Sequence, residues 1–189
     1  MHKPQQMLTI PQAIGILKQG GVIAYPTEAI FGLGCDPDND QAIQQILDLK
    51  LRPADKGLII IASEVTQLKA YVDKLTDQQW QQAIITWPGP ITWLMPAHPS
   101  VSNMLTGKHD TIAVRVTQHP IAKALCEQYG KPIVSTSANK SNEQPALSAK
   151  DVYDQFDGLV NCIVDGEVDT QSTPSEIRDL LSNKVIRSH

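Results

Sequence analysis

The sequence lacks several features that would assign the protein to a class at once. No apolar run approaches the roughly 20 residues that span a bilayer, and the opening MHKPQQMLTIPQ has no charged-then-apolar signal pattern. The three cysteines, Cys35, Cys126 and Cys162, form no C-x-x-C pair, so neither a zinc knuckle nor a redox pair is indicated. We therefore expect a cytoplasmic protein with no membrane segment and with buried thiols.

Strong positive charge is also missing. The formal net charge is −4 over 189 residues, of which 41% are hydrophobic and 19% charged. These values are ordinary for a globular protein, and they argue against a protein that coats nucleic acid with its whole surface. Because no repeat or linker interrupts the chain, we expect one domain over residues 1–189, with any polyanion site confined to one place.

A polar turn follows a buried strand in residues 22–34, VIAYPTEAIFGLG. The strand is expected to end at Pro26, so that Thr27 and Glu28 lie where α/β sheets usually present ligand-binding groups. The FGLG that follows predicts a glycine-spaced loop with close backbone approach. The pattern is neither a Walker A loop nor a dinucleotide fingerprint. The alternative is an ordinary strand exit with a solvated Glu28.

Three cations fall within seven residues at the end of a predicted helix that begins at residue 39 or 40 and in the segment that follows it. Lys50 continues the apolar stripe of this helix at its last turn, and Arg52 and Lys56 follow just before another buried strand. Together they predict a local anion site. The alternatives are that Lys50 complements the helix dipole or extends outward, and that the segment is a solvated basic loop.

Residues 111–117, TIAVRVT, form the clearest alternating strand of the chain. One face carries Thr111, Ala113, Arg115 and Thr117, and the other carries Ile112, Val114 and Val116. An arginine in such a strand is costly unless it meets an anion or a carboxylate. The alternative is an exposed arginine on an edge strand.

An apolar strand changes abruptly into small hydrogen-bonding side chains in residues 132–139, PIVSTSAN. Ser135 and Ser137 point the same way as Ile133 in an extended chain, and Asn139 follows at the turn. Such a group can hold phosphate or ribose oxygens through hydroxyls and backbone amides. A plain turn closed by serine or threonine is the alternative.

The remaining elements follow from periodicity and from proline and glycine punctuation. We predict helices over residues 11–18, 65–71, 76–86, 120–129 and 151–156, strands over 58–62, 91–95 and 161–165, and a hairpin of 172–179 with 185–187. Residues 97–110 are expected to form a loop. His98 and His109 are too far apart for a metal-ligand motif.

Four separated stretches, YPTEAIFGLGCDP, KLRPADKGLII, TIAVRVTQHP with the downstream STSAN, and TPSEIRD, together closely resemble the YrdC-like family. The resemblance extends over nearly the whole chain. It implies an α/β fold, a single-domain open twisted sheet with flanking helices and a concave basic cleft. It also implies that the protein joins L-threonine, bicarbonate or CO2, and ATP into L-threonylcarbamoyladenylate with release of pyrophosphate, the first step of t6A37 tRNA modification.

The same resemblance implies roles for individual residues. The implied site residues are Thr27, Arg115 and Ser135 for L-threonine, and Lys50, Arg52, Lys56, Thr111, Ser137, Asn139 and Arg178 for the nucleotide. Lys50 and Arg52 would position the triphosphate for reaction, and Arg115 would bind the threonine carboxylate. Arg178 is the weaker nucleotide candidate. Asn142 departs from the glycine of many relatives, so a less closely binding loop is expected there, and no acid, base or catalytic histidine is assigned.

The resemblance also implies the ligands and partners. Mg²⁺ is expected to arrive with ATP, held mainly by the nucleotide and water, because the sequence shows no dedicated carboxylate cage. A downstream threonylcarbamoyl transferase complex would take the product, and tRNA or double-stranded RNA are further candidate partners. Two alternatives stay open: a double-stranded RNA-binding or ribosome maturation protein that uses the same cleft, and a family member with a different acyl acceptor.

Overall fold

The computed structural model describes residues 7–169 and 175–188. Its strands are β1 (Met7–Leu8), β2 (Ile23–Pro26), β3 (Phe31–Gly34), β4 (Ile59–Ala62), β5 (Ile91–Pro96), β6 (Thr111–Val116), β7 (Ile133–Ser137), β8 (Cys162–Val164), β9 (Glu176–Asp179) and β10 (Val185–Arg187). Its helices are α1 (Ile10–Lys18), α2 (Asp40–Lys50), the 3₁₀ turn η1 (Ala54–Lys56), α3 (Val65–Leu68), α4 (Asp77–Ile84), α5 (Asn103–Thr106), α6 (Pro120–Tyr129) and α7 (Ala149–Phe156).

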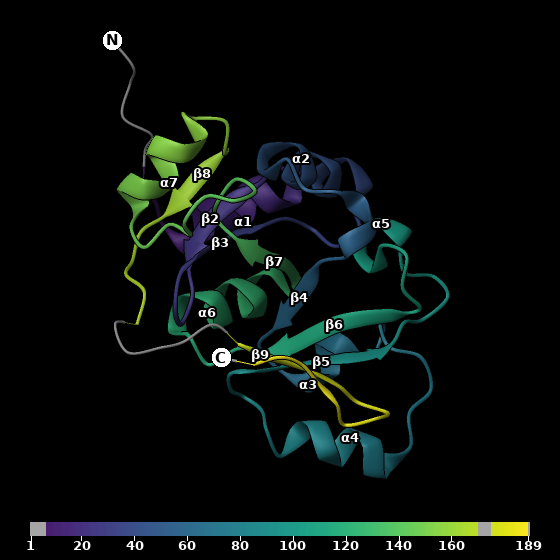
Figure 1. Ribbon diagram of the computed structural model, residues 1–189. Helices are drawn as coiled ribbons and strands as arrows, with labels where there is room; N and C mark the ends of the chain where they lie inside the picture. Colours follow the sequence, from purple (N-terminus) through teal and green to yellow (C-terminus); the bar gives the residue numbers. More distant parts are fainter. Residues whose placement is uncertain (1–6, 170–174, 189) are drawn as a thin grey trace.

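The strands pair into one mixed sheet in the order β1-β8-β2-β3-β7-β4-β6-β5-β9-β10 (Figure 1). The pairs β1–β8, β2–β8, β4–β6 and β5–β9 are parallel, and the other neighbours are antiparallel. Strand β7 joins the two halves of the sheet, because it pairs with β3 on one side and with β4 on the other. The polar end of β7 therefore lies at the centre of the molecule.

Helices cover the two faces of the sheet unequally. On one face, side chains such as Ile60, Val114 and Val134 belong to a large apolar core that also includes buried residues of α2 and α7. On the other face, Ile61 and Ile133 pack with α1 and α6. Helix α1 packs against β8 and β2, and α6 packs against β2 and β4. Towards β5 and β9 the second face instead forms the floor of a cavity.

The structure confirms the α/β class and the predicted helices at 11–18, 39–50, 76–86, 120–129 and 151–156 to within a few residues at their ends. The predicted helix over 65–71 ends sooner, at Leu68. The strands of the predicted terminal hairpin are present as β9 and β10, whereas residues 172–174 of that prediction lie outside the described residues. No helix in the described parts of the chain is long and apolar enough to cross a membrane.

Two predicted loops were wrong. Residues 97–110 contain the short helix α5, whose first turn is capped by the Ser102 hydroxyl, which accepts from the amide of Met104 at 3.2 Å. The FGLG segment is strand β3, paired with both β2 and β7. Its glycines serve packing, since a Cβ on Gly34 would lie 2.6 Å from the Val134 carbonyl oxygen and 2.7 Å from the Tyr25 ring. The expected buried thiols are confirmed, because all three cysteines are buried and free.

Candidate active site

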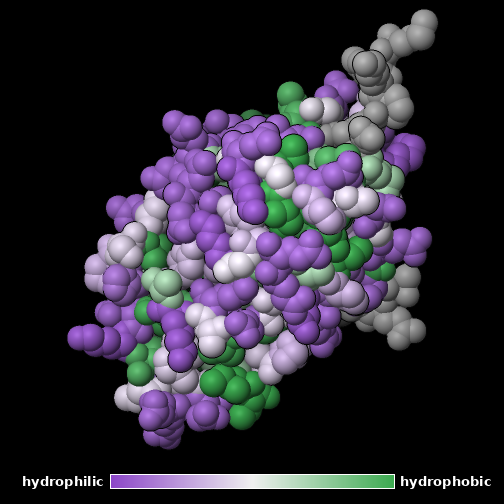
Figure 2. Space-filling view, turned by 180° about the vertical axis from the view of Figure 1, so that it is seen from behind, coloured by the Kyte–Doolittle hydropathy of each residue, from purple (hydrophilic) through white to green (hydrophobic). Residues whose placement is uncertain are grey.

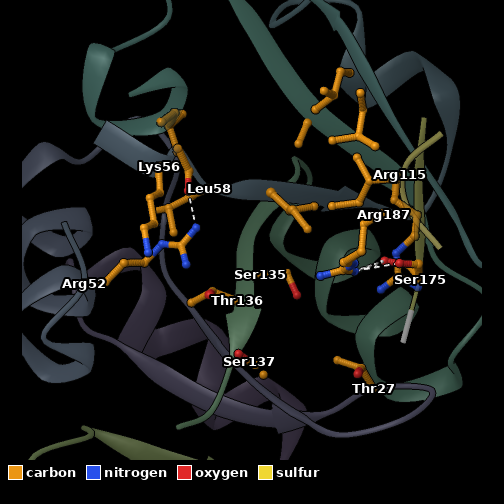
Figure 3. Close-up of a pocket in the computed structure, with 18 of the residues that line it drawn as sticks. Thr27, Arg52, Lys56, Leu58, Arg115, Ser135, Thr136, Ser137, Ser175 and Arg187 are labelled. Atoms are coloured by element: carbon orange, nitrogen blue, oxygen red, sulfur yellow. Dashed lines mark hydrogen bonds between the residues drawn. The ribbon is translucent and has the colours of Figure 1, made fainter. Parts of the chain in front are cut away.

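A cavity of about 400 Å³ opens on the second face of the sheet. Its floor carries residues of neighbouring strands, Ile59 of β4, Ala113 of β6, and Ser135 and Ser137 of β7. Two walls rise from this floor (Figure 3). We call them the α2–β4 wall, with Arg52, Lys56 and Leu58, and the β6–β10 wall, with Arg115, Ser175 and Arg187.

The α2–β4 wall begins where α2 ends. Leu51 adopts a left-handed conformation with φ 51°, and the amide of Arg52 donates to the Leu47 carbonyl at 3.0 Å, which turns the chain off the helix axis. The Arg52 guanidinium then donates to the Gly57 carbonyl at 2.9 Å, while its Nε–H is buried without a hydrogen-bond partner among the described residues. Burial lowers the pKa of Arg52, with Asp55 opposing this effect. Cationic N–H groups on this wall are thus available to an anion.

Arg115 lies in the β6–β10 wall and is 8% exposed. Because β6 lies between β4 and β5, the alternative of an exposed edge-strand arginine is wrong. The carboxylate partner that the sequence analysis called for is Glu28, whose Oε2 lies 3.0 Å from Nη1 of Arg115. The Nε–H of Arg115 is buried and makes no hydrogen bond within the described residues. A ligand carboxylate is one group that would satisfy it.

Glu28 is held from two sides and is 5% exposed, so the alternative of a solvated carboxylate is wrong. Its Oε1 accepts from the Thr117 hydroxyl at 2.7 Å and from the amide of Gln118 at 3.3 Å, and its Oε2 faces Arg115. Burial raises the pKa of Glu28, but the charge of Arg115 and the hydrogen bond from Thr117 outweigh it and hold the pKa below its usual value. Glu28 is therefore ionised at neutral pH.

Arg187 and Ser175 were not among the residues predicted for the site. Arg187 lines the cavity and donates to the carbonyl oxygen of Ser175 at 2.6 Å and to its hydroxyl at 3.3 Å. Burial and the charge of Arg115 lower the pKa of Arg187, so the two guanidinium groups repel each other across the same space. The strand 185–187 was predicted, but a three-residue strand gives no signal for which face its arginine occupies.

Lys50 and Asn139 do not line the cavity, although both were predicted for the nucleotide site. Lys50 is 4% exposed, so the alternative of an outward side chain is wrong. Its Nζ donates to the carbonyl oxygens of Ser137 and, at 2.8 Å, of Asn139. Burial and the charge of Arg52 lower the pKa of Lys50 to about 8. Lys50 thus holds the backbone at the end of β7 without lining the cavity. Its contact with a triphosphate stays a prediction.

The other predicted residues divide between the cavity and its surroundings. Thr27, Lys56, Thr111, Ser135 and Ser137 line the cavity. Arg178 does not, because Ile177 faces the cavity, the strand alternates, and Arg178 pairs with Glu176 instead.

Asn142 lies outside the lining as well. It adopts φ 69°, in the left-handed region that asparagine tolerates, so the departure from glycine preserves the backbone turn.

Carboxylates are scarce in this cavity. Glu28 is the single acidic residue among its described lining residues, against Arg52, Lys56, Arg115 and Arg187. Within residues 7–169 and 175–188, no group of three or more histidine, cysteine, aspartate or glutamate side chains could hold a metal ion. The arrangement therefore suits ligands that carry several negative charges.

Comparison with known proteins assigns this chain to a family. A family model described as "Telomere recombination", which covers the Sua5, YciO and YrdC proteins, matches residues 15–189. The chain belongs to this family.

Individual relatives refine the comparison. The threonylcarbamoyl-AMP synthase of Photobacterium profundum is 48% identical over 183 residues, covering 96% of this chain and 99% of that protein. That of Vibrio vulnificus is 47% identical over 180 residues, covering 94% and 97%. Among solved structures, P. abyssi Sua5 complexed with L-threonine superposes with a TM-score of 0.85 at 35% identity, covering 91% of this chain and 51% of that one. The chain thus spans about half the length of Sua5.

Proposed function

We propose that this protein is a threonylcarbamoyl-AMP synthase, a nucleotidyltransferase that forms L-threonylcarbamoyladenylate and pyrophosphate from L-threonine, bicarbonate or CO2, and ATP. The observation that carries the proposal is one cavity with two cationic walls on either side of the serine-bearing end of β7 (Figure 3). Relatives of that name at 47–48% identity, nearly coextensive with this chain, support it.

The β6–β10 wall is the proposed threonine side. The unsatisfied Nε–H of Arg115 would bind the amino-acid carboxylate, and the hydroxyls of Thr27 and Ser135 lie on the same cavity surface. The Thr27 hydroxyl donates to the Ile30 carbonyl at 2.7 Å, which leaves its oxygen lone pairs as acceptors for a ligand N–H or O–H. A solved relative contains L-threonine, which agrees with an amino-acid site in this fold.

The α2–β4 wall is the proposed triphosphate side. Arg52 and Lys56 would bind phosphate oxygens, while Thr111 and Ser137 line the path between the walls. Mg²⁺ would enter with the nucleotide, because the one carboxylate in the described lining, Glu28, is already engaged by Arg115 and Thr117. The ion would then neutralise phosphate charge during the reaction.

The proposed chemistry needs positioning more than covalent catalysis. The threonine amine adds CO2 to give a carbamate, a carbamate oxygen attacks the α-phosphorus of ATP, and the α–β phosphoanhydride bond breaks to release pyrophosphate. Holding the two substrates on facing walls lowers the entropic cost of their encounter. Cations at the phosphates offset charge that builds up in the transition state. No side chain is required to become covalently attached.

The product would pass to a threonylcarbamoyl transferase complex that acts on tRNA, and the enzyme would work in the cytoplasm. The free buried cysteines agree with a reducing compartment.

The test is incubation with ATP, L-threonine, bicarbonate and Mg²⁺, each omitted in turn, with pyrophosphate release measured and the product identified by mass spectrometry. Threonine-dependent pyrophosphate release is expected, and folded protein without it would refute the proposal. Binding of double-stranded RNA that weakens steeply with salt, together with no turnover, would favour the RNA-binding alternative instead. Turnover with another acyl acceptor would favour the third interpretation.

A further inference from the structure

Glu28 has no role in the activity proposed so far, yet it is the most heavily engaged side chain of the cavity. It follows strand β2, whereas its partners Arg115 and Thr117 lie in and directly after strand β6. The two segments are not neighbours in the sheet, since β3, β7 and β4 lie between their strands. The loop after β2 therefore carries Glu28 towards β6, where its carboxylate contacts Arg115.

The division of contacts on the carboxylate is specific. One oxygen, Oε1, accepts from Thr117 and Gln118, and the other, Oε2, faces Nη1 of Arg115. This ion pair, in which Oε2 makes no hydrogen bond with the described residues, holds one corner of the Arg115 guanidinium. Its Nε–H is left buried and without a partner in the described part of the chain.

We propose that Glu28 is a positioning residue, which orients Arg115 so that its free N–H groups meet the carboxylate of the amino-acid substrate. This inference rests on the proposed function for the identity of the substrate. It assigns Glu28 no contact with the reacting atoms.

A different role, as the base that deprotonates the threonine amine, fits the environment of Glu28 poorly. The neighbouring cation and hydroxyl donor stabilise the ionised carboxylate and hold its pKa below the usual value, which makes it a weak proton acceptor. Oε1 is also already engaged by Thr117 and Gln118, and Oε2 is buried from solvent beside Arg115.

The test is Glu28→Gln, because an amide offers one acceptor oxygen where the carboxylate offers two. Glutamine can keep either the Thr117 side or the Arg115 side, and its NH2 group then opposes the donors of the other. Since hydrogen bonds to charged groups are involved, we expect the KM for L-threonine to rise on the order of tenfold or more. We expect kcat and the KM for ATP to change less than about threefold.

A double-mutant cycle separates positioning from a merely structural role. If Glu28 acts through Arg115, then Glu28→Gln should add almost nothing to the threonine KM of an Arg115→Gln variant. Glu28→Asp, which keeps two acceptor oxygens, should recover part of the loss. Asp36→Asn is the matched control, because Asp36 is a carboxylate that accepts from Lys131 and Tyr129 outside the cavity and also has a lowered pKa. It should leave the threonine KM unchanged even if it lowers the melting temperature.

An unchanged threonine KM in Glu28→Gln, additive effects with Arg115→Gln, or a loss confined to kcat would each overturn the inference. Should Glu28→Gln fail to fold, the same cycle is run with Glu28→Asp. Each variant is also titrated with L-threonine by calorimetry, which needs no turnover. A wild-type protein that binds threonine without releasing pyrophosphate would contradict the proposed function. The role of Glu28 would still be tested, because the threonine affinities of the variants can be compared without turnover.

Discussion

Arg52 and Arg115 face one cavity from opposite walls, and they differ in what each guanidinium contacts. Arg52 donates to a neutral backbone carbonyl, that of Gly57. Arg115 is paired with the carboxylate of Glu28. Among the described residues, no carboxylate forms a salt bridge with Arg52 or Lys56, so the α2–β4 wall keeps its positive charge.

The difference matches two kinds of ligand. A wall with uncompensated cations favours a group with several negative charges, such as a triphosphate. A wall whose cation is partly neutralised tolerates a zwitterion, since the ammonium group of an amino acid is less strongly repelled. The two arginines should therefore respond differently when each is removed.

The largest effect is expected for Arg52→Ala. Loss of a cation from the uncompensated wall should lower kcat/KM for ATP on the order of 100-fold, because charge-assisted contacts to phosphate would be lost. The KM for L-threonine should change little. Steady-state kinetics with one substrate varied at a time measures both. Lys108→Ala removes a nearby exposed cation that pairs with Asp55 outside the cavity lining, and it should be nearly silent.

A smaller effect of opposite selectivity is expected for Arg115→Ala. The KM for L-threonine should rise by about one to two orders of magnitude, whereas the KM for ATP should stay within a few-fold. Thermal unfolding is measured alongside, because this substitution leaves the buried Glu28 without its cation. Equal increases in both KM values would contradict the assignment of separate walls.

Lys50 is expected to make ATP binding depend on pH. Its pKa of about 8 means that it is protonated below that pH and neutral above it. A neutral amine holds the carbonyls of Ser137 and Asn139 less firmly and adds no positive charge beside the cavity. ATP affinity, measured by calorimetry without threonine, should thus fall a few-fold between about pH 7 and pH 9. Lys50→Arg should remove this dependence, since guanidinium stays protonated, and a fall that persists in this variant would implicate another group.

The smallest effect concerns stability in acid. The pKa of Glu28 is lower in the folded protein than its ordinary 4.5. Its ion pair therefore contributes stability above about pH 4.5, and this contribution is lost as the pH falls through the lower folded-state pKa. Urea unfolding at several pH values should show the free energy of unfolding decreasing over that range, with a shallower slope in Glu28→Gln. Identical slopes would contradict the depressed pKa.

The strand residues that face the cavity could largely be predicted from the sequence. The alternation of TIAVRVT assigned Thr111 and Arg115 to one face, and the same reasoning assigned Ser135 and Ser137 to the face of Ile133. All four line the cavity. Period-2 patterns identify which residues share a face because that relation is local to a strand.

The walls were harder to predict because they depend on contacts between distant segments. Nothing local shows that Glu28 meets Arg115, which lies 87 positions later in the chain, or that Arg187 lies near Arg115. The carbonyl contacts of Lys50 are likewise set by the position of β7. For FGLG, the glycine spacing suggested a loop, but the close neighbours Tyr25 and Val134 require a glycine at position 34 within a strand.

The position of β7 between the two halves of the sheet has a consequence for stability as well as for binding. The turn at residues 27–30 follows β2 in one half, whereas Arg52 precedes β4 and Arg115 lies in β6 of the other half. A ligand that contacts Thr27 and Arg115 together therefore links the two halves of the sheet across β7. Substrates that bind the folded state in this way raise its resistance to unfolding as their concentration rises above Kd. Seen from behind the view of Figure 1, the surface is mixed, with hydrophobic residues scattered among hydrophilic ones (Figure 2).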